Sequence, residues 1–420
     1  MHPAALLDLT TGLVREVLAG QHPADRTVSA WFRTHRALGP RERHTLAETA
    51  YAVLRQRLLW QHLAQGGRGP LERRLAILAW QGDPAYLRRG LSPEDAAWAD
   101  AMAAVDRAAL PERLRHNLPA WMVEALAPRI AGAELLAMAE ALNRPAPLDL
   151  RVNALKCRRE EARQALAAEG IACEPTPHSP WGLRAQGKPP LDRTQAFARG
   201  EVEVQDEGSQ LLALLTGAGR GEMVVDFCAG AGGKTLALGA MMRNTGRLYA
   251  FDTSGHRLDA LKPRLARSGL SNVHPAQIAH ERDDRVRRLA GKIDRVLVDA
   301  PCSGLGTLRR NPDLKWRQTP ESVAEMAVRQ QAILTAAARL LRPGGRLVYA
   351  TCSLLAQENE AVVAGFDAEH GRDFERLPAA ALLEAGHAGD AAHLEEGGFL
   401  RLWPHVHGTD GFFAAAWQRR

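Results

Sequence analysis

Apolar positions spaced by four predict helices in the first third of the chain. Four apolar residues recur with this spacing: Leu46, Ala50, Leu54 and Leu58. The spacing places their side chains on one helix face and leaves Arg55 and Arg57 on other sides. Ala, Leu and Arg dominate the surrounding sequence, and β-branched residues are few. We therefore predict an independent all-α bundle over residues 1–135.

The pattern changes after residue 145. Residues 148–153 have the alternation of a strand, 158–169 have helical spacing, and 175–190 form a Pro/Gly-rich hairpin or loop. This combination predicts a small α+β subdomain over residues 145–200.

Short apolar runs alternate with helical stretches after residue 200. Strands are expected at Met223–Phe227, Arg247–Phe251, Arg295–Val298 and Arg346–Tyr349. Helical patterns lie between them, for example at 254–268 and 320–341. This alternation predicts a parallel sheet with crossover helices, and so an α/β domain over residues 201–420.

Composition narrows the class of protein. The chain has 420 residues, of which 46% are hydrophobic and 24% charged, a balance typical of globular domains. No apolar run is long enough for a membrane span, and the N-terminus lacks the pattern of a secretory signal. The five cysteines are scattered, with no CxxC pair, which argues against a disulfide framework or a zinc site. We expect a cytoplasmic protein that needs neither a membrane nor a metal.

Positive charge is concentrated near the N-terminus. The formal net charge is +6, and the stretch from Arg26 to Arg74 holds ten arginines against three acidic residues. Such a basic zone suits phosphate binding. The alternative is a solvated helical face.

A glycine-rich loop follows the first strand of the α/β region. Residues 224–235 read as an apolar strand, a turn and the start of a helix. Glycines allow close backbone approach to a ligand, and a helix N-terminus offers free N–H groups. A phosphate-binding Walker A loop is excluded because Cys228 stands at its first glycine. The dinucleotide-binding motif GxGxxG does not match either, because Thr235 occupies the position of its third glycine.

Asp252 supports a nucleoside site at this loop. It lies about twenty residues past Gly232, at the end of the next strand, where an acidic side chain can bind ribose hydroxyls. The alternative is a purely structural glycine turn.

Two cysteines follow predicted strands. Asp299-Ala300-Pro301-Cys302-Ser303-Gly304 comes directly after one strand, and Thr351-Cys352-Ser353 after another. Residues beyond the carboxyl ends of parallel strands face the ligand crevice, so Cys302 and Cys352 can share one site. We expect Cys157 and Cys173 to be buried apolar residues and Cys228 to pack in the glycine loop.

Together, the motifs Asp226–Thr235, Asp299–Gly304 and Thr351–Ser353 resemble those of the Sun/Nop2 family of RNA cytosine-5 methyltransferases. The resemblance extends from about residue 145 to the end, with support from five further stretches: Arg151–Asn153, Val204–Asp206, Arg309–Asp313, Arg342–Gly345 and Asp410–Phe413. The helical first third is similar to the NusB-like RNA-binding domain found in one branch, that of the bacterial small-subunit ribosomal RNA methyltransferases B. Ala231 departs from the family, which usually has proline there.

The resemblance implies a fold, a cofactor and the residues that bind it. The fold is a multidomain one, with an all-α NusB-like bundle, a small α+β insert that contacts RNA, and a Rossmann-like methyltransferase domain. The cofactor is S-adenosylmethionine. The residues expected to bind it are Cys228, Ala229, Gly230, Ala231, Gly232, Gly233, Lys234, Asp252, Glu281 and Asp299. At the position of Glu281, Asp283 and Asp284 are alternatives.

The resemblance also implies a mechanism. Cys352 supplies a thiolate that adds to carbon 6 of a cytosine, which activates carbon 5 for methylation. Cys302 helps to remove the carbon-5 proton and to release the product, and Asp299 hydrogen-bonds the base.

The expected partner is RNA, most like small-subunit ribosomal RNA, bound by a monomer. Transfer RNA is an alternative substrate, and a non-catalytic assembly factor is an alternative function. A basic stretch after Cys302 is expected to contact phosphates, with Trp316 either stacking on a base or packing in a core; its cations are Arg309, Arg310, Lys315 and Arg317.

Overall fold

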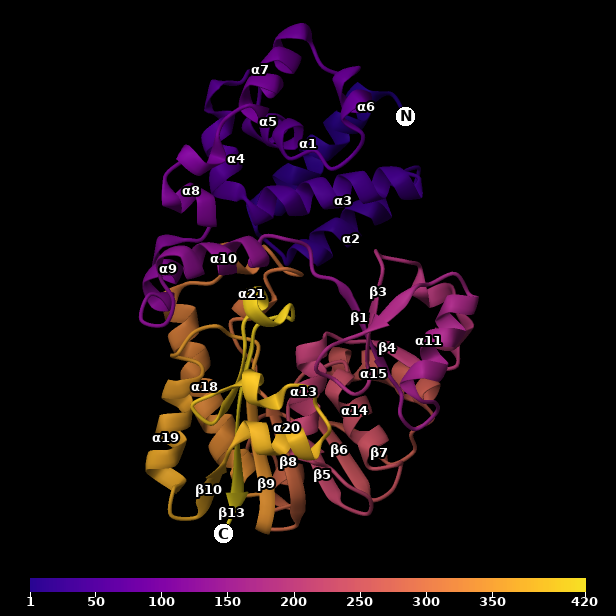
Figure 1. The fold of residues 1–420 in the computed structure, drawn as a ribbon, viewed down its shortest axis with the longest axis vertical. Helices are drawn as coiled ribbons and strands as arrows, with labels where there is room; N and C mark the ends of the chain where they lie inside the picture. The colour runs from indigo at the N-terminus through magenta and orange to yellow at the C-terminus, as the bar shows by residue number, and fades with distance from the viewer. The chain divides into compact units, whose positions relative to one another are not determined.

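Two units make up the computed structural model, which describes residues 1–420 (Figure 1). The first comprises Met1–Pro145 and Thr307–Thr319, and the second comprises Ala146–Gly306 and Pro320–Arg420. The segment Thr307–Thr319 therefore belongs with helices that lie far from it in the sequence.

The first unit is helical. Its helices are α1 (Pro3–Ala19), α2 (Ala24–Thr34), α3 (Pro40–Arg55), α4 (Arg57–Leu63), α5 (Leu71–Leu78), α6 (Pro84–Arg88), α7 (Pro93–Ala103), α8 (Glu112–His116), α9 (Ala120–Leu126), α10 (Gly132–Leu142) and α17 (Leu314–Arg317), with 3-10 turns η1 (Ala64–Gly66) and η2 (Arg107–Ala109). A further 3-10 turn, η4 (Leu305–Thr307), begins in the second unit and ends at the first residue of the segment Thr307–Thr319. Helix α1 packs against α3 and α5 around a core that includes Leu13, Leu46 and Leu75. The helical pattern at Leu46–Leu58 is interrupted at Gln56, where α3 ends and α4 begins. Arg55 is buried, contrary to its expected place away from the core.

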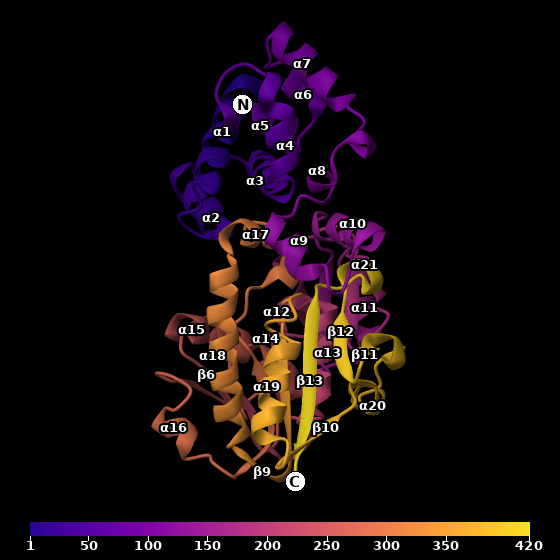
Figure 2. The same ribbon diagram turned by 90° about the vertical axis from the view of Figure 1, so that its left-hand side faces the viewer.

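The segment Thr307–Thr319 packs on the first unit through the C-terminus of α3. The last carbonyls of a helix have no partner within it. Trp316 Nε1 donates to the carbonyl of Leu54 at 2.7 Å, and Lys315 Nζ donates to the carbonyl of Arg55 at 2.6 Å. Asp313 accepts a hydrogen bond from the backbone N–H of Ala24 at the start of α2, and Figure 2 shows α17 beside α2.

These contacts correct one expectation. Lys315 is only 1% exposed, and its ammonium also donates to Asn143 Oδ1 at 2.7 Å. Its side chain is not free to contact a phosphate. Trp316 packs against the core of the helical unit, as in the packing alternative.

A four-stranded antiparallel sheet begins the second unit. Its strands, in the order β2-β3-β1-β4, are β1 (Leu148–Val152), β2 (Cys173–Pro175), β3 (Gly182–Ala185) and β4 (Val202–Val204). The associated helices are α11 (Arg159–Ala168), η3 (Leu191–Arg193) and α12 (Gln195–Ala198). Strands β2 and β3 form the expected hairpin. Cys173 is buried in this core, as predicted.

A nine-stranded mixed sheet dominates the second unit, in the order β11-β12-β13-β9-β8-β5-β6-β7, with β10 also paired to β13. Its strands are β5 (Met223–Asp226), β6 (Arg247–Asp252), β7 (Val273–Gln277), β8 (Ile293–Asp299), β9 (Leu341–Thr351), β10 (Phe374–Leu377), β11 (Glu395–Glu396), β12 (Phe399–Leu402) and β13 (Phe412–Arg419). The run from β7 to β9 is parallel, as predicted. Strand β13 pairs antiparallel with β9, so the expectation of a purely parallel sheet is wrong.

Helices cover both faces of this sheet. They are α13 (Glu207–Thr216), α14 (Gly233–Met241), α15 (Gly255–Ser268), α16 (Asp284–Arg287), α18 (Pro320–Ala338), α19 (Glu360–His370), α20 (Ala379–Ala385) and α21 (Pro404–His407), with the 3-10 turn η5 (Ala391–Leu394). Alternate residues of β13 enter two different cores: Ala414 packs with α13, α14 and α20, and Trp417 packs with α18 and α19 (Figure 2). Helix α18 ends before the predicted limit because Leu341 already begins β9. None of the helices is both long and apolar enough to cross a membrane.

The buried Lys315 predicts a pH-dependent stability. Burial lowers the pKa of its ammonium to about 7, whereas an unfolded lysine titrates near 10.4. Between these values the unfolded chain binds more protons than the folded one, so this group makes stability rise with pH. The neutral amine still has two N–H groups, enough for both of its acceptors.

Urea titrations give the unfolding free energy of wild type and of Lys315→Met at each pH. We expect the value for wild type to rise relative to that for Lys315→Met by about 1–2 kcal/mol between pH 7 and pH 9. Lys262→Met, at an exposed lysine of α15, is the control and should show no such trend. A difference that stays constant with pH would contradict the prediction.

Candidate active site

The glycine loop connects β5 to α14 in a conformation that only glycine adopts easily. Gly230 and Gly232 have φ of +56° and +83°. A Cβ at Gly232 would lie 2.1 Å from Leu261 Cδ1, so the loop also packs tightly on α15. The carbonyl of Ala231, the residue that departs from the family pattern, accepts a hydrogen bond from Arg264 at 2.6 Å.

The structure brings Asp252 to this loop. Its Oδ2 accepts the backbone N–H of Gly230 at 2.9 Å, and its Oδ1 accepts that of Ser254 at 2.7 Å. A carboxylate oxygen can accept more than one hydrogen bond. Asp252 therefore orients the loop and keeps acceptor capacity for a ligand.

Lys234 and Asp299 form an ion pair beside the loop, with Nζ 2.6 Å from Oδ2. Burial lowers the pKa of the Lys234 ammonium, but the Asp299 carboxylate and, to a smaller extent, Cys352 raise it more, so the net pKa is raised. The lysine therefore remains a cation within electrostatic range of Cys352.

The two cysteines predicted to share one site lie side by side. Cys302 follows β8, Cys352 follows β9, and their sulfurs are 3.3 Å apart. The hydrogen bond to Cys352 and burial raise the pKa of the Cys302 thiol well above its usual value. Cys302 therefore keeps its proton, and either sulfur can donate to the other in this contact.

A buried glutamate that the sequence analysis missed joins the two cysteine loops. Glu358 Oε1 accepts the backbone N–H of Ser303 at 2.7 Å and Gln330 Nε2 at 3.0 Å. Glu358 Oε2 accepts the hydroxyls of both Ser303 and Ser353. Each serine follows one of the cysteines directly, so this carboxylate fixes both loops.

Two further contacts fix the cysteine loops. Thr351 donates through its hydroxyl to Asn359, and Asn359 donates to the carbonyl of Ser353. Gly306 donates to the carbonyl of Cys352, and a Cβ at Gly306 would lie 2.1 Å from the carbonyl oxygen of Gly411. The only available signals in the sequence were polar residues five to seven positions after Cys352 and the late Asp410–Phe413 motif.

The acidic residues considered after β7 have different contacts. Asp283 caps α16 and accepts the backbone N–H groups of Ala279 and Arg285. Asp284 pairs with Arg287, and Glu281 lies 3.5 Å from Arg282. Glu281 has no bond to the glycine loop among these contacts, and its assignment stays a prediction. Cys228 is partly buried in the loop, and burial raises the pKa of its thiol.

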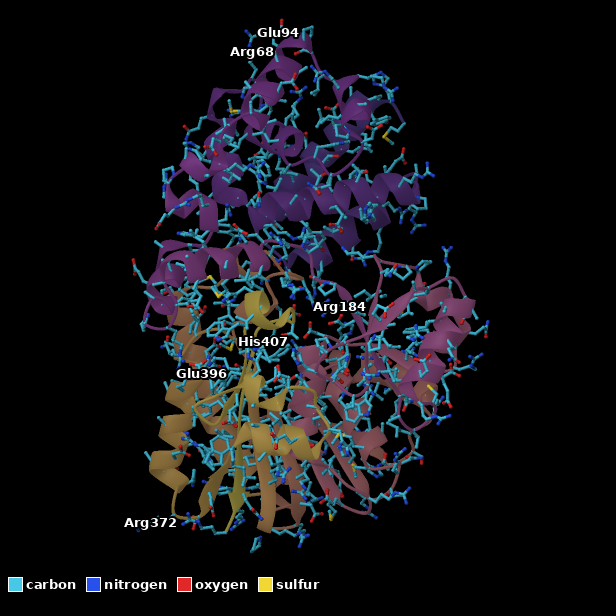
Figure 3. The ribbon with its side chains drawn as sticks, viewed as in Figure 1. Arg68, Glu94, Arg184, Arg372, Glu396 and His407 are labelled. Carbon is cyan, nitrogen blue, oxygen red and sulfur yellow. The ribbon has the colours of Figure 1, made fainter.

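The supporting motifs connect the small sheet to the site. Arg151 donates to Gln205 at 2.6 Å, and burial lowers the pKa of its guanidinium to about 10. Asp206 caps α13 and accepts the backbone N–H of Asp410. Arg184, labelled in Figure 3 with His407, pairs with Asp149 and donates to the carbonyl of Gly408.

The chain is similar to known proteins in sequence and in fold. The model of the family described as 16S rRNA methyltransferase RsmB/F matches residues 213–418. The model of the RsmF/B-like ferredoxin-like domain matches residues 118–192. The crystal structure of PH0851 superposes with a TM-score of 0.78 over 100% of this chain and 99% of its own, at 25% identity.

Two curated relatives are similar in sequence. The probable ribosomal RNA small subunit methyltransferase B of Synechocystis is 36% identical over 302 residues, 72% of this chain and 66% of that protein. The protein of the same name in Bacillus subtilis is 36% identical over 276 residues, 66% of this chain and 60% of that protein. The matched part thus spans slightly less than two thirds of these relatives.

The fold is that of a Rossmann-like methyltransferase with a mixed sheet and a helical N-terminal region. Within this class, the chain belongs to the RsmB/F methyltransferase family.

The role of Glu358 can be tested by stability. Glu358→Ala removes an acceptor that receives four hydrogen bonds, of which only those of Gln330 and the two serine hydroxyls have another partner nearby, and we expect it to lower the unfolding free energy by about 3 kcal/mol. Glu358→Gln should cost less because the serine hydroxyls can turn to accept from the new amide. Glu384→Ala, at an exposed position of α20, is the matched control. Equal urea midpoints for Glu358→Ala and the control would contradict the assignment.

Proposed function

We propose that this chain transfers a methyl group from S-adenosylmethionine to carbon 5 of a cytosine in small-subunit ribosomal RNA, through a covalent bond between Cys352 and the base. The observation that carries the proposal is the pair of thiols 3.3 Å apart at the ends of β8 and β9, beside the ion pair of Lys234 and Asp299. Membership of the RsmB/F family supports RNA as the substrate.

The glycine loop fits the proposed cofactor. Residues 228–234 and Asp252 surround the carboxyl ends of β5 and β6, where nucleosides bind in sheets of this kind. Asp252 has acceptor capacity for two ribose hydroxyls, and the N-terminus of α14 adds free N–H groups. Ala231, Glu281 and Asp299 complete the proposed binding set. The cofactor supplies an electrophilic methyl group.

The two thiols have different environments, which supports different roles. The raised pKa of Cys302 keeps its proton, and the Lys234 cation lies within electrostatic range of Cys352, so we assign the nucleophile to Cys352. The Cys352 thiolate adds to carbon 6, and the ring electrons then make carbon 5 nucleophilic. After methylation, Cys302 assists removal of the carbon-5 proton, the bond to Cys352 breaks, and the thiolate leaves. Asp299 hydrogen-bonds the base near its ring nitrogen.

The RNA target must present an unpaired or extruded cytosine, because a stacked base cannot reach the two partly buried thiols. In this proposal the helical unit is a NusB-like RNA-binding domain, and the small sheet contacts RNA. The protein acts as a monomer.

Labelled methyl transfer to small-subunit ribosomal RNA tests the cysteine roles. Wild type should transfer label, and Cys352→Ala should lose activity by at least about a thousandfold because no covalent activation remains. Cys302→Ala should accumulate a protein–RNA adduct on a denaturing gel, since release of the product needs this residue. Cys157→Ala, a cysteine distant in sequence and function, is the control.

An adduct formed by Cys352→Ala instead would assign the nucleophile to Cys302. Transfer only to transfer RNA would refute the ribosomal substrate. A wild type inactive on every RNA would favour an assembly factor without catalysis.

Cofactor binding is tested at Asp252. Asp252→Asn should weaken S-adenosylmethionine binding by about tenfold or more in calorimetry, because one of its two acceptor oxygens becomes a donor. Asp259→Asn, an exposed residue of α15, should bind as wild type does. If wild type and both variants bound S-adenosylmethionine with equal affinity, Asp252 would not be a cofactor-binding residue.

A further inference from the structure

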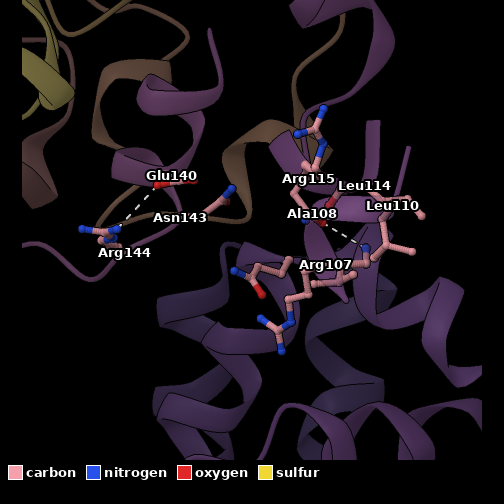
Figure 4. Close-up of a pocket in the computed structure, with 11 residues that line it drawn as sticks. Arg107, Ala108, Leu110, Leu114, Arg115, Glu140, Asn143 and Arg144 are labelled. Carbon is pink, nitrogen blue, oxygen red and sulfur yellow. Dashed lines mark hydrogen bonds and ion pairs between the residues drawn. The ribbon is translucent and has the colours of Figure 1, made fainter. Parts of the chain in front are cut away.

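A pocket of about 450 Å³ lies within the helical unit, apart from the residues of the candidate active site. Figure 4 shows Glu140 of α10, with Asn143 and Arg144 that follow this helix, on one side and the stretch from Arg107 to Arg115 on the other. Its volume is in the range of pockets for small ligands.

The pocket is rich in positive charge. Arg107, Arg115 and Arg144 line it, against the single carboxylate of Glu140. The Arg144–Glu140 pair is 3.6 Å long and both side chains are largely exposed, so it contributes little and can exchange for a phosphate. The Nε of Arg115 is buried without a hydrogen-bond partner, and its Nη2 lies 3.5 Å from the exposed carboxylate of Glu112, a pair that contributes little and can exchange for a phosphate. The lining therefore offers guanidinium donors to an anion.

The other lining residues are apolar or are held in place by contacts within the helical unit. Half-buried Leu110 presents apolar surface on which a base can lie, and the buried Leu59 and Leu114 complete this apolar wall of the pocket. The guanidinium of Arg107 is held 5.2 Å above the ring of Trp60. Asn117 accepts from the backbone N–H of Leu59 and donates to the carbonyl of Leu114, so the pocket wall is held by internal hydrogen bonds.

We propose that this pocket binds one unpaired nucleotide of the substrate RNA, with its phosphate on the arginines and its base on the leucines. The proposal rests on the function proposed above, because it takes RNA as the substrate. Guanidinium groups bind phosphate through paired donors, and an apolar surface accepts a base of any sequence. The pocket thus adds affinity for a single-stranded region away from the target cytosine.

The test measures binding of the full chain to a fluorescein-labelled single-stranded RNA of about 12 nucleotides by anisotropy, across a series of salt concentrations. The double variant Arg115→Gln/Arg144→Gln should raise Kd about tenfold and reduce the salt slope by about 0.7, because the one phosphate held in the pocket is no longer neutralised. Arg88→Gln, an exposed arginine of α6 paired with Asp100, is the matched control and should leave both unchanged.

A second variant tests the pocket without removing any contact. Ala108→Glu places a negative charge at an exposed lining position and should also raise Kd severalfold, whereas Ala103→Glu, on the exposed side of α7, should not. Circular dichroism checks that each variant folds. If both pocket variants bind RNA as their controls do, the proposal is wrong. Free cytidine monophosphate is the competitor. If it displaced the labelled RNA at a concentration below the Kd of the RNA, the pocket would prefer a free nucleotide, and the proposal would be wrong.

The outcomes separate this proposal from the proposed function. Unchanged RNA binding by the pocket variants, in a protein whose wild type methylates RNA, refutes the pocket alone. Weakened binding by the pocket variants, in a protein whose wild type transfers no methyl group, refutes catalysis and supports the pocket.

Discussion

The buried carboxylate of Glu358 is the constraint on which the site depends. A buried charge is costly unless hydrogen bonds surround it, and here Ser303, Ser353 and Gln330 supply them. Ser303 follows β8, Ser353 follows β9 and Gln330 lies on α18. Because one carboxylate needs hydrogen bonds from both loops, it holds the two strand ends together. The separation of the sulfurs of Cys302 and Cys352 follows from this arrangement.

The charges on the other side of the site are arranged around the same strand ends. Burial raises the pKa of Asp226 to about 7, even though the Thr235 hydroxyl donates to it and so lowers the pKa. The adjacent Asp299 keeps its partner Lys234, and this pairing maintains a cation next to Cys352. A lysine that were merely buried would tend to lose its charge. Asp299 therefore acts on the thiol indirectly, by preserving the charge of Lys234.

Much of the second unit could be predicted from local patterns. The glycine loop, Asp252 and the two cysteines each follow a short apolar run, and the rule that strand ends meet at one edge was enough to place them together. The antiparallel strands were not predicted, because β13 is buried on both faces and its apolar residues show no alternation. Glu358 was missed for a related reason: its partners are backbone and hydroxyl groups, which leave no charge pattern in the sequence.

The segment Thr307–Thr319 shows how a charge pattern alone can mislead. Its cations and tryptophan have the composition of a nucleic-acid contact, yet Lys315 and Trp316 donate to the carbonyls of Arg55 and Leu54. A helix end requires donors wherever it is buried, and the sequence does not say which distant residues supply them. Conversely, the arginines of the proposed RNA pocket are dispersed between residues 107 and 144 and form no run. A high density of basic residues along the chain therefore does not identify the cations that can bind a phosphate. In the helical unit, packing around the end of α3 determines which of them remain available.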